Sequence, residues 1–301
     1  MAIGQEVCQI EPSFTILILK AKSMNGEERC LRSLAVIRCS GPDAVPFLQG
    51  QLTSDVGRLE GRTQLAAYAT AQGRVIAILR LFGRDDALYA LLPAALASPV
   101  VGRLRKFVLR AKARIDALED WSVTWVGSDA SRSAGTAQPA DVAAGLVFEY
   151  PDGRRLLARP GAAAEDPEAE QLWQAADVAA GLPQVSAETT EHYVPQMLNL
   201  DLLDAISFTK GCYTGQEIVA RTQNLGRIKR RTFRYAIRSD EAPAPLSALH
   251  LDTTKVGEVL LCARVAGGVE LLAVVALDAR DRPLRTASGH TAVPLRLPYA
   301  V

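Results

Sequence analysis

The spacing of hydrophobic residues changes along the chain, and each spacing predicts a different element. Apolar residues at 34–39 predict a strand, and the Ser-Gly-Pro sequence at 40–42 predicts a helix that Ser40 caps and that ends near Gln51. A longer helix, rich in leucine, valine and arginine, ends near Lys112. Between the two helices, short apolar runs separated by glycine turns predict an antiparallel meander: residues 65–70, 74–82 and 87–92.

The patterns that predict strands and helices both occur again after residue 140. Short apolar runs at 146–149 and 155–158 predict strands, and residues 167–180 predict a helix that stops at Gly181. From residue 229 onward the apolar runs are short and separated by glycine and proline turns, with no helical period. The chain is therefore expected to be α+β, with two mixed units followed by a small antiparallel β-barrel.

Two stretches do not fit these elements. The regular pattern begins only near Leu31, so residues 1–30 are expected to be a poorly ordered N-terminal extension, with Met24 as an alternative start. Residues 127–139 contain almost nothing apolar larger than alanine, which predicts a mobile surface loop. The expected division is an extension, two lobes that can interleave, and a barrel: residues 1–30, 31–126, 140–228 and 229–301.

The composition is that of an ordinary folded protein. The 301 residues are 49% hydrophobic and 22% charged, and 34 lysines and arginines against 33 aspartates and glutamates give a net charge of +1. With a net charge this close to zero, the protein as a whole does not attract polyanions, so direct nucleic-acid binding is not expected. Any such binding would need a local patch of basic residues. The longest N-terminal apolar run, residues 14–19, is too short to span a bilayer, and no membrane contact is expected.

The cysteines and histidines exclude several kinds of site. The five cysteines are widely spread and form no C-x-x-C pair, which favours a reducing compartment and a cytoplasmic protein. The three histidines lie far apart and form no H-E-x-x-H pair. No metal site is expected, and metallohydrolase and serine-hydrolase chemistry are poorly supported.

One predicted strand of the barrel carries a basic face. Its arginines alternate with apolar residues, so the two sets point to opposite faces. The basic face is expected to be solvated rather than a site for an anionic tail or tRNA. The two sets are Arg230, Arg234 and Arg238, and Phe233, Tyr235 and Ile237.

The sequence KGCYTGQEIVAR at residues 210–221 carries the most chemical information. Thr214 and Glu217 have the spacing of a capping box, which predicts a helix from Gly215 to about residue 225. Cys212 then lies just before a helix N-terminus and two residues from Lys210, a setting that lowers the pKa of a thiol. Cys212 is therefore a candidate functional thiolate with Lys210 beside it. The alternative is a small buried residue in a tight turn.

This string resembles the K-G-C-Y-x-G-Q-E-x-x-x-R signature of the YgfZ family of folate-binding proteins, which are relatives of the glycine cleavage T-protein. Every fixed position of the signature is present, and weaker similarity is found at residues 47–55, 72–76 and 195–201. The resemblance covers the chain from about Leu31 to its C-terminus. It implies three lobes around a central hole that admits tetrahydrofolate or a one-carbon derivative, with a β-barrel as the last lobe.

The resemblance also implies which side chains contact the folate. Glu217 and Arg221 are four residues apart on the predicted helix, so the alternative for this pair is a surface ion pair worth about 0.3 to 0.5 kcal/mol. The candidate wall residues are Tyr213, Gln216, Glu217, Arg221, Gln49 and Gln51.

One departure from the T-protein pattern bears on activity. Related aminomethyltransferases carry carboxylates after a hairpin glycine, where this chain has Ala77 and Ile78. An apolar side chain cannot orient an amine, and loss of a positioned acid or base costs about 10² to 10⁴ in rate. One-carbon transfer by the T-protein mechanism is therefore not expected.

The resemblance implies a folate-binding accessory protein for assembly or repair of iron–sulfur enzymes, including enzymes that methylthiolate tRNA. Its partners would be those enzymes and cluster assembly proteins. The alternatives are a folate-dependent aminomethyl or methyl transferase and an RNA-binding module. The role of Cys212 is open at this point: the thiol could ligate iron, reduce or accept sulfur, or attack a folate adduct.

Overall fold

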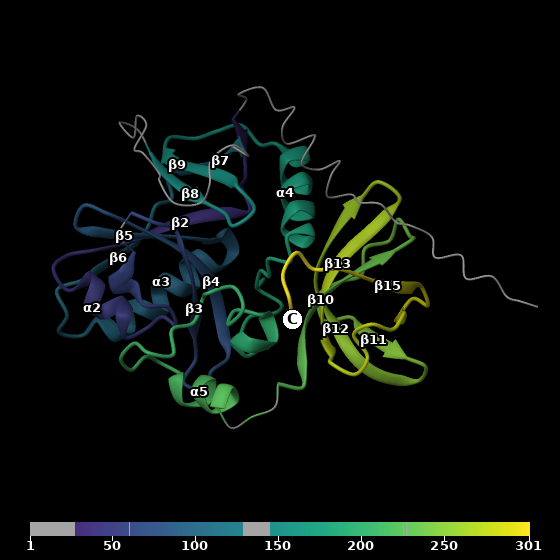
Figure 1. Ribbon diagram of the computed structural model, residues 1–301. Coiled ribbons are helices and arrows are strands. Elements are labelled where there is room, and N and C mark those ends of the chain that lie inside the picture. Colours follow the sequence, from purple (N-terminus) through teal and green to yellow (C-terminus); the bar gives the residue numbers. More distant parts are fainter. Residues whose placement is uncertain (1–27, 60, 129–144, 225, 227) are drawn as a thin grey trace, which may run out of the picture.

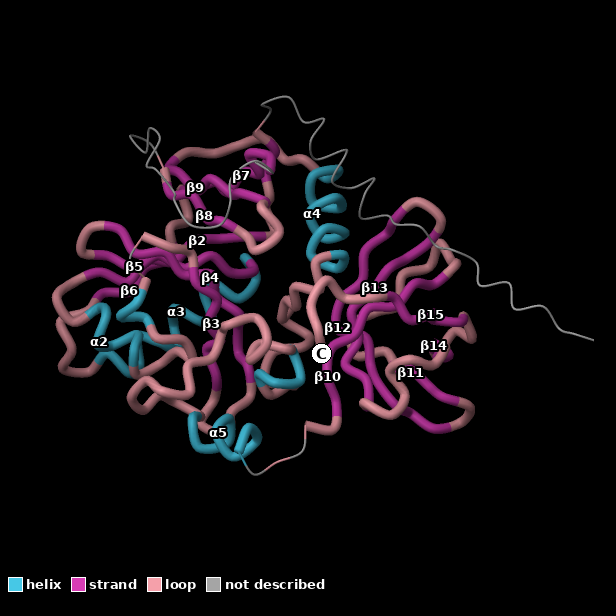
Figure 2. The backbone as a smooth tube through the Cα atoms, viewed as in Figure 1, coloured by secondary structure: helices cyan, strands magenta, loops and turns pink. Residues whose placement is uncertain are grey.

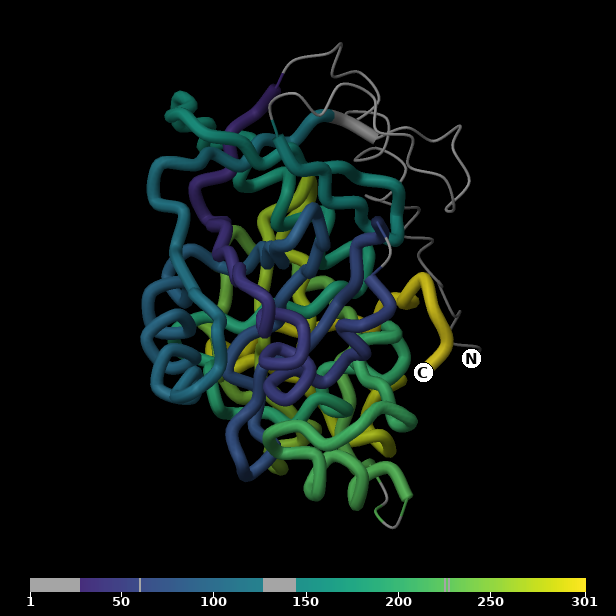
Figure 3. Tube along the Cα trace, turned by 90° about the vertical axis from the view of Figure 1, so that its left-hand side faces the viewer, coloured from purple at the N-terminus to yellow at the C-terminus, as the bar shows by residue number. Residues whose placement is uncertain are grey.

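The computed structural model describes residues 28–59, 61–128, 145–224, 226 and 228–301, arranged as three lobes (Figures 1 and 2). The N-terminal extension up to residue 27 and the expected loop from residue 129 to 139 lie outside the described residues, whereas Arg29–Cys30 of the extension and residues 127–128 of the loop belong to strands. Viewed from the side of the first lobe (Figure 3), the barrel lies behind that lobe, and the segment that carries α5 forms the lower end of the molecule. No helix in the described residues is long and apolar enough to cross a membrane.

The first lobe is a five-stranded antiparallel sheet in the order β3-β4-β5-β2-β6. The predicted meander is confirmed as β3, β4 and β5, which pair as neighbours. The strands are β2 (Leu34–Ser40), β3 (Gln64–Ala69), β4 (Val75–Arg84), β5 (Ala87–Pro93) and β6 (Arg114–Ala117). The helical elements are α2 (Ala44–Gln49), η1 (Val56–Arg58) and α3 (Ala94–Val108).

Two helix boundaries in this lobe differ from the prediction. Ser40 does not cap α2, because Gly41 turns the chain at φ +107° and Asp43 occupies the N-cap position. The α3 helix ends at Val108 rather than near Lys112, because Leu109 leaves the helical conformation with φ 40° and ψ −98°. Both differences arise where the loop before α2 meets the loop after α3, a contact between residues about 70 positions apart.

The second lobe is a four-stranded antiparallel sheet in the order β1-β7-β9-β8, with α4 beside it. The two predicted strands and the predicted helix are confirmed, and Gly181 ends α4 with φ +66°. Its elements are β1 (Arg29–Cys30), β7 (Trp121–Ser128), β8 (Leu146–Glu149), β9 (Arg154–Pro160) and α4 (Pro167–Ala179). A long segment then carries η2 (Pro195–Leu198) and α5 (Gln216–Asn224) back to the first lobe.

The C-terminal lobe is the predicted antiparallel barrel, closed in the order β10-β13-β12-β11-β14-β15. Tyr235 and Ile237 of β10 belong to its apolar core, as their alternation indicated. The expected solvated basic face is wrong at Arg234, which is buried in an ion pair with Glu270 and also donates to Ala179 O of α4. The strands are β10 (Arg230–Ile237), β11 (Ala248–Leu251), β12 (Thr254–Val265), β13 (Gly268–Ala276), β14 (Leu284–Thr286) and β15 (Thr291–Leu295).

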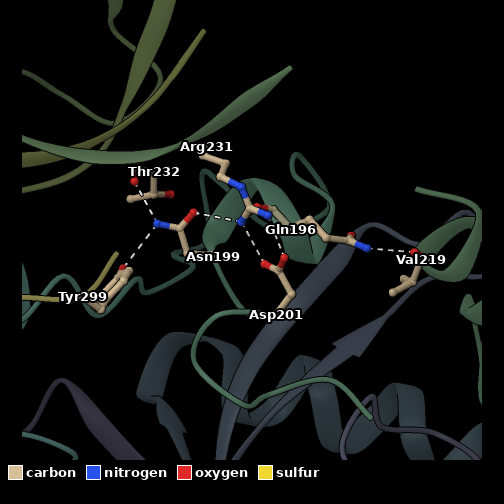
Figure 4. A network of polar contacts seen from close by, with 7 residues as sticks. All are labelled: Gln196, Asn199, Asp201, Val219, Arg231, Thr232 and Tyr299. Atoms are coloured by element: carbon tan, nitrogen blue, oxygen red, sulfur yellow. Dashed lines mark hydrogen bonds and ion pairs between the residues drawn. The ribbon is translucent and has the colours of Figure 1, made fainter. Parts of the chain in front are cut away.

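The segment at residues 195–201 joins α5 and the barrel through buried polar side chains (Figure 4). Gln196 Nε2 donates to Val219 O of α5 at 2.8 Å, and Asn199 Nδ2 donates to Thr232 O of β10 at 2.8 Å. Arg231 of β10 forms two hydrogen bonds with the Asp201 carboxylate, at 2.9 and 2.7 Å. These contacts fix the barrel relative to the segment that carries α5.

We predict that Asp201→Ala lowers the free energy of unfolding by about 3 to 5 kcal/mol, because it leaves the guanidinium of Arg231 buried without its counter-charge. The Asp201 and Arg231 side chains are only 6% and 11% exposed. The matched control is Asp281→Ala, which removes an exposed ion pair with Arg280 and should cost less than about 1 kcal/mol. Urea denaturation of the two variants measures the difference, and equal midpoints would contradict the role given to the buried pair.

Candidate functional site

Lys210 holds the signature segment against the first lobe. Its ammonium donates to three backbone carbonyls of the turn after α2, Gln49 O at 2.7 Å, Leu52 O at 2.8 Å and Ser54 O at 2.7 Å. Burial lowers the pKa of Lys210 to about 8, so the side chain remains mostly an ammonium at neutral pH and has three protons to donate. The sequence predicted that the Lys210 ammonium lies beside the Cys212 thiol. In the structure the ammonium is instead hydrogen-bonded to the 49–54 turn.

Two glycines allow the signature segment to touch the β3–β4 hairpin. Gly215 has φ +84°, and a Cβ there would lie 2.4 Å from Thr70 O and 3.1 Å from the Cα of Gly73. Gly73 has φ +69°, and a Cβ there would lie 3.0 Å from the Cβ of Ile218. The close approach of the two backbones therefore requires glycine on both sides. Thr214 N adds a hydrogen bond to Gly50 O at 3.1 Å.

Cys212 is exposed on this anchored loop. Among the described residues, the other cysteines are Cys30 and Cys39, which are buried, and Cys262, which is half-buried. Burial raises the pKa of Cys39 to about 12 and raises that of Cys262 as well. Cys39 lies in β2, the strand that the sequence predicted at 34–39, and Cys262 lies in β12 of the barrel. The alternative that Cys212 is a small buried turn residue is wrong.

The helix after Cys212 is confirmed as α5, but its acidic and basic residues face solvent. The Glu217 carboxylate accepts from Arg221 Nη2 at 2.8 Å, with side chains 78% and 63% exposed. The two residues thus form the surface ion pair that was the alternative for them. Gln216 is half-buried at the first turn, and its backbone N–H donates to Tyr213 O.

The remaining predicted contacts lie between α5 and the turn after α2. Tyr213 is buried, with its ring 5.1 Å from the Lys210 ammonium, and burial raises the pKa of its phenol to about 12. The Gln49 amide is used within its own turn, where it donates to Asp55 Oδ1 and accepts from Val56 N. Gln51 Oε1 is buried without a hydrogen-bond partner among the described residues. Roles of these residues in folate binding stay predictions.

A large cavity lies elsewhere, where all three lobes meet. It has a volume of 570 Å³ and is mostly apolar. None of its lining residues comes from the described part of the segment 207–224. They come from the start of β2, the end of β5, α4, the loop after α4 and the barrel: Ser33, Leu34, Pro93, Glu170, Gln171, Trp173, Gln174, Asp177, Gln184, Val185, Ser186, Pro245, Leu260, Leu261 and Cys262.

A buried polar cluster adjoins this cavity at Asp177. Asp177 accepts from Arg154 Nη2 at 2.7 Å, and burial raises the pKa of the Asp177 carboxyl although Arg154 opposes the shift. Arg80 lies 3.5 Å over the ring of Tyr150, and its Nε has no hydrogen-bond partner among the described residues. Arg80, Tyr150, Asp177 and Ile78 line a second, enclosed cavity of ≈ 10 Å³, so the position expected to carry a T-protein carboxylate has an apolar side chain there.

Sequence reasoning did not find these cavity residues. Trp173, Gln174 and Asp177 were assigned only to a helix, and Arg80 only to a strand. A carboxylate on the apolar side of a predicted helix, next to Trp173, was the available signal, because an acidic residue is almost never fully buried unless it is paired. Among the described residues, no group of three or more histidine, cysteine or acidic side chains is arranged to hold a metal ion.

No protein-family model matches the chain, but relatives and a solved structure do. The chain is 34% identical over 275 residues to the "tRNA-modifying protein YgfZ" of Edwardsiella ictaluri, covering 80% of this chain and 82% of that protein. It is 31% identical over 291 residues to the protein of the same name from Serratia proteamaculans, covering 87% and 88%. Glycine cleavage system aminomethyltransferase T from Bartonella henselae has the same fold, with a TM-score of 0.70 over 94% of this chain and 88% of that chain at 14% identity. The predicted T-protein-like fold is confirmed.

We predict that Lys210→Met lowers the free energy of unfolding by about 3 kcal/mol, because three carbonyls of the 49–54 turn lose a charged donor. The control is Lys106→Met on α3, the same chemical change at an exposed position, which should stay within about 0.5 kcal/mol of wild type. Urea denaturation measures both. A Lys210→Met protein as stable as wild type would show that the hydrogen bonds of Lys210 to the turn do not stabilise the fold.

Proposed function

The chain belongs to the family of YgfZ tRNA-modifying proteins, and from that membership we propose that it is a tetrahydrofolate-binding accessory protein for iron–sulfur enzymes. It would support their assembly or repair, including that of enzymes that methylthiolate tRNA, with those enzymes and cluster assembly proteins as partners. The cytoplasmic location inferred from the cysteine pattern belongs to the same proposal.

The observation that carries the proposal is the cavity between the three lobes. Its 570 Å³ falls within the range of small-ligand sites, which are mostly apolar with a few polar groups that fix orientation. A pterin ring fits this chemistry, because its faces are flat and apolar while one edge presents N–H donors. The carboxylates of Glu170 and Asp177 are acceptors for that edge. The described lining contains no lysine or arginine, so the glutamate tail would extend out of the cavity into solvent.

The position of Cys212 bears on the three roles left open for its thiol. The segment that carries Cys212 does not contribute to the described lining of the cavity, so attack on a folate adduct bound there is the least supported role. An exposed thiol on a loop fixed by Lys210 and Gly215 is instead accessible to another protein. We therefore assign the thiol to contact with a partner's iron or sulfur.

The competing function is a folate-dependent aminomethyl or methyl transferase, which the shared fold with aminomethyltransferase T favours. Ala77 and Ile78 of β4 are both buried and apolar, and so provide no acid or base at the positions where the T-protein pattern has carboxylates. Loss of such a group costs about 10² to 10⁴ in rate. The accessory role is therefore better supported than transfer.

We predict that Gln174→Trp weakens tetrahydrofolate binding at least tenfold, because an indole on α4 would occupy part of the cavity. Gln223→Trp makes the same change on α5, where the side chain is also exposed, and should bind like wild type. Calorimetry measures affinity, and the shift in melting temperature provides a second readout, since a ligand selective for the folded state must stabilise it. Absence of heat and of thermal shift in the wild type would contradict folate binding, and turnover of a tetrahydrofolate one-carbon adduct would favour the transferase.

A second prediction concerns the thiol. Cys212→Ser should fold like wild type, because the side chain is exposed, but should fail to restore iron–sulfur enzyme activities in a strain that lacks this protein. Cys39→Ser places a hydroxyl in the core, so it should lower stability by about 1 to 2 kcal/mol while the folded protein keeps its function. Full complementation by Cys212→Ser would remove the thiol from the mechanism.

A further inference from the structure

One surface of the first lobe, at the end of α3, combines positive charge with exposed apolar side chains. The stretch 103–114, which spans the end of α3 and the start of β6, contains six basic residues in a chain whose net charge is +1: Arg103, Arg105, Lys106, Arg110, Lys112 and Arg114. Phe107 is 50% exposed and Leu109 is 87% exposed, the largest value among the exposed large apolar side chains in the described chain. We call residues 105–114 the basic patch.

Nearby acidic residues neutralise only part of this charge. Arg103 pairs with Glu191, and Arg105 and Arg114 both contact Asp116. The side chains of Lys106, Arg110 and Lys112 are exposed and have no acidic partner among the described residues. The patch therefore keeps three uncompensated cations around Phe107 and Leu109.

The patch is held in a fixed conformation. The apolar face of α3 is buried in the core through Val100, Val101 and Leu104, and Phe107, three residues after Leu104 near the end of the helix, is half exposed. After the helix, Lys112 N donates to Asp43 Oδ2 at 2.6 Å and Lys112 O accepts from Asp43 N at 3.3 Å. The loop also lies directly on Gly41, where a Cβ would be 2.4 Å from Lys112 O. An exposed phenylalanine and leucine are thus presented by an anchored loop.

We propose that the basic patch binds an unpaired stretch of RNA. Lys106, Arg110 and Lys112 would contact successive phosphates, and Phe107 would stack on an exposed base, which is how proteins bind single-stranded nucleic acid without reading its sequence. RNA loops and bulges provide such bases, because their unstacked bases can be turned outward. None of its residues lines the cavity or belongs to the signature segment, so the proposal does not rest on folate binding.

Two other partners fit the patch less well. An amphipathic helix that binds an anionic membrane needs a continuous apolar face, whereas the apolar face of α3 is already buried and Phe107 and Leu109 lie two residues apart. An acidic protein segment would satisfy the cations but would not need an aromatic ring among them. The near-zero net charge led us to expect no direct nucleic-acid binding, but net charge does not report where the charges gather.

The proposal can be tested with two RNA probes of equal charge, a hairpin with a large unpaired loop and a fully paired duplex. The full-length protein should bind the hairpin about tenfold more tightly than the duplex. Phe107→Ala should remove that preference, since stacking contributes at this order of magnitude. The triple variant Lys106→Gln, Arg110→Gln and Lys112→Gln should reduce the slope of log K against log salt by about 2, as expected for three contacts with single-stranded phosphates.

The matched control carries three glutamines at exposed arginines of the barrel, Arg264→Gln, Arg282→Gln and Arg285→Gln, and should bind both probes like wild type. Equal affinity for hairpin and duplex, unaffected by Phe107→Ala, would overturn the proposal in favour of a general polyanion surface. Binding to vesicles of anionic lipid but not to the hairpin would overturn it in favour of a membrane. Loss of binding in the barrel control would place the RNA on another surface. Melting temperatures of all variants should equal that of wild type, because every substituted side chain is exposed.

Discussion

Three backbone carbonyls at the end of α2 and in the turn after it all accept a hydrogen bond from the same group, the buried ammonium of Lys210. Buried carbonyls require hydrogen-bond donors. Much of the signature segment depends on this contact. With Lys210 fixed, Gly215 can meet Gly73 of the β3–β4 hairpin, α5 can start at Gln216, and Cys212 stays at the surface between two anchored residues.

The same segment has a second attachment, which connects it to the barrel. Gln196 reaches Val219 of α5, while Arg231 and Thr232 of β10 bond to residues 199 and 201. The barrel, the segment that carries α5 and the first lobe are therefore linked by polar contacts between residues distant in sequence. The cavity lies where these lobes converge, and two of its lining residues, Ser33 before β2 and Glu170 of α4, are hydrogen-bonded to each other there. The Cys212 thiol and the cavity therefore lie on different parts of the chain, but the same set of polar contacts holds those parts together.

Sequence reasoning succeeded where the signal is local. The strands β2 to β5, the helix α4 and the C-terminal barrel follow from spacing and turn residues that lie within each element, and the signature segment identified the fold. It failed where the deciding partner is distant. The hydrogen bonds of the Lys210 ammonium need the turn at 49–54, the burial of Arg234 needs Glu270 and α4, and the loop after α3 needs Asp43. Nothing near these residues in sequence indicates those partners. For Asp177 the sequence offered one sign, its place on the apolar side of a helix next to Trp173, but its partner Arg154 comes from the distant strand β9.

The hydroxyl of Tyr299 donates to Gly181 O at 2.7 Å and accepts from Asn199 Nδ2 at 3.3 Å. The third residue from the C-terminus thus closes the contact between the end of α4 and the segment that leads to α5. A chain emerges from the ribosome N-terminus first, and its early domains fold while later ones are still being made. The first lobe can therefore form during synthesis, but this closing contact must wait until Tyr299 has been made. Until then the carbonyl at the end of α4 lacks the donor that Tyr299 provides, so this joint is among the last parts of the described structure to be completed.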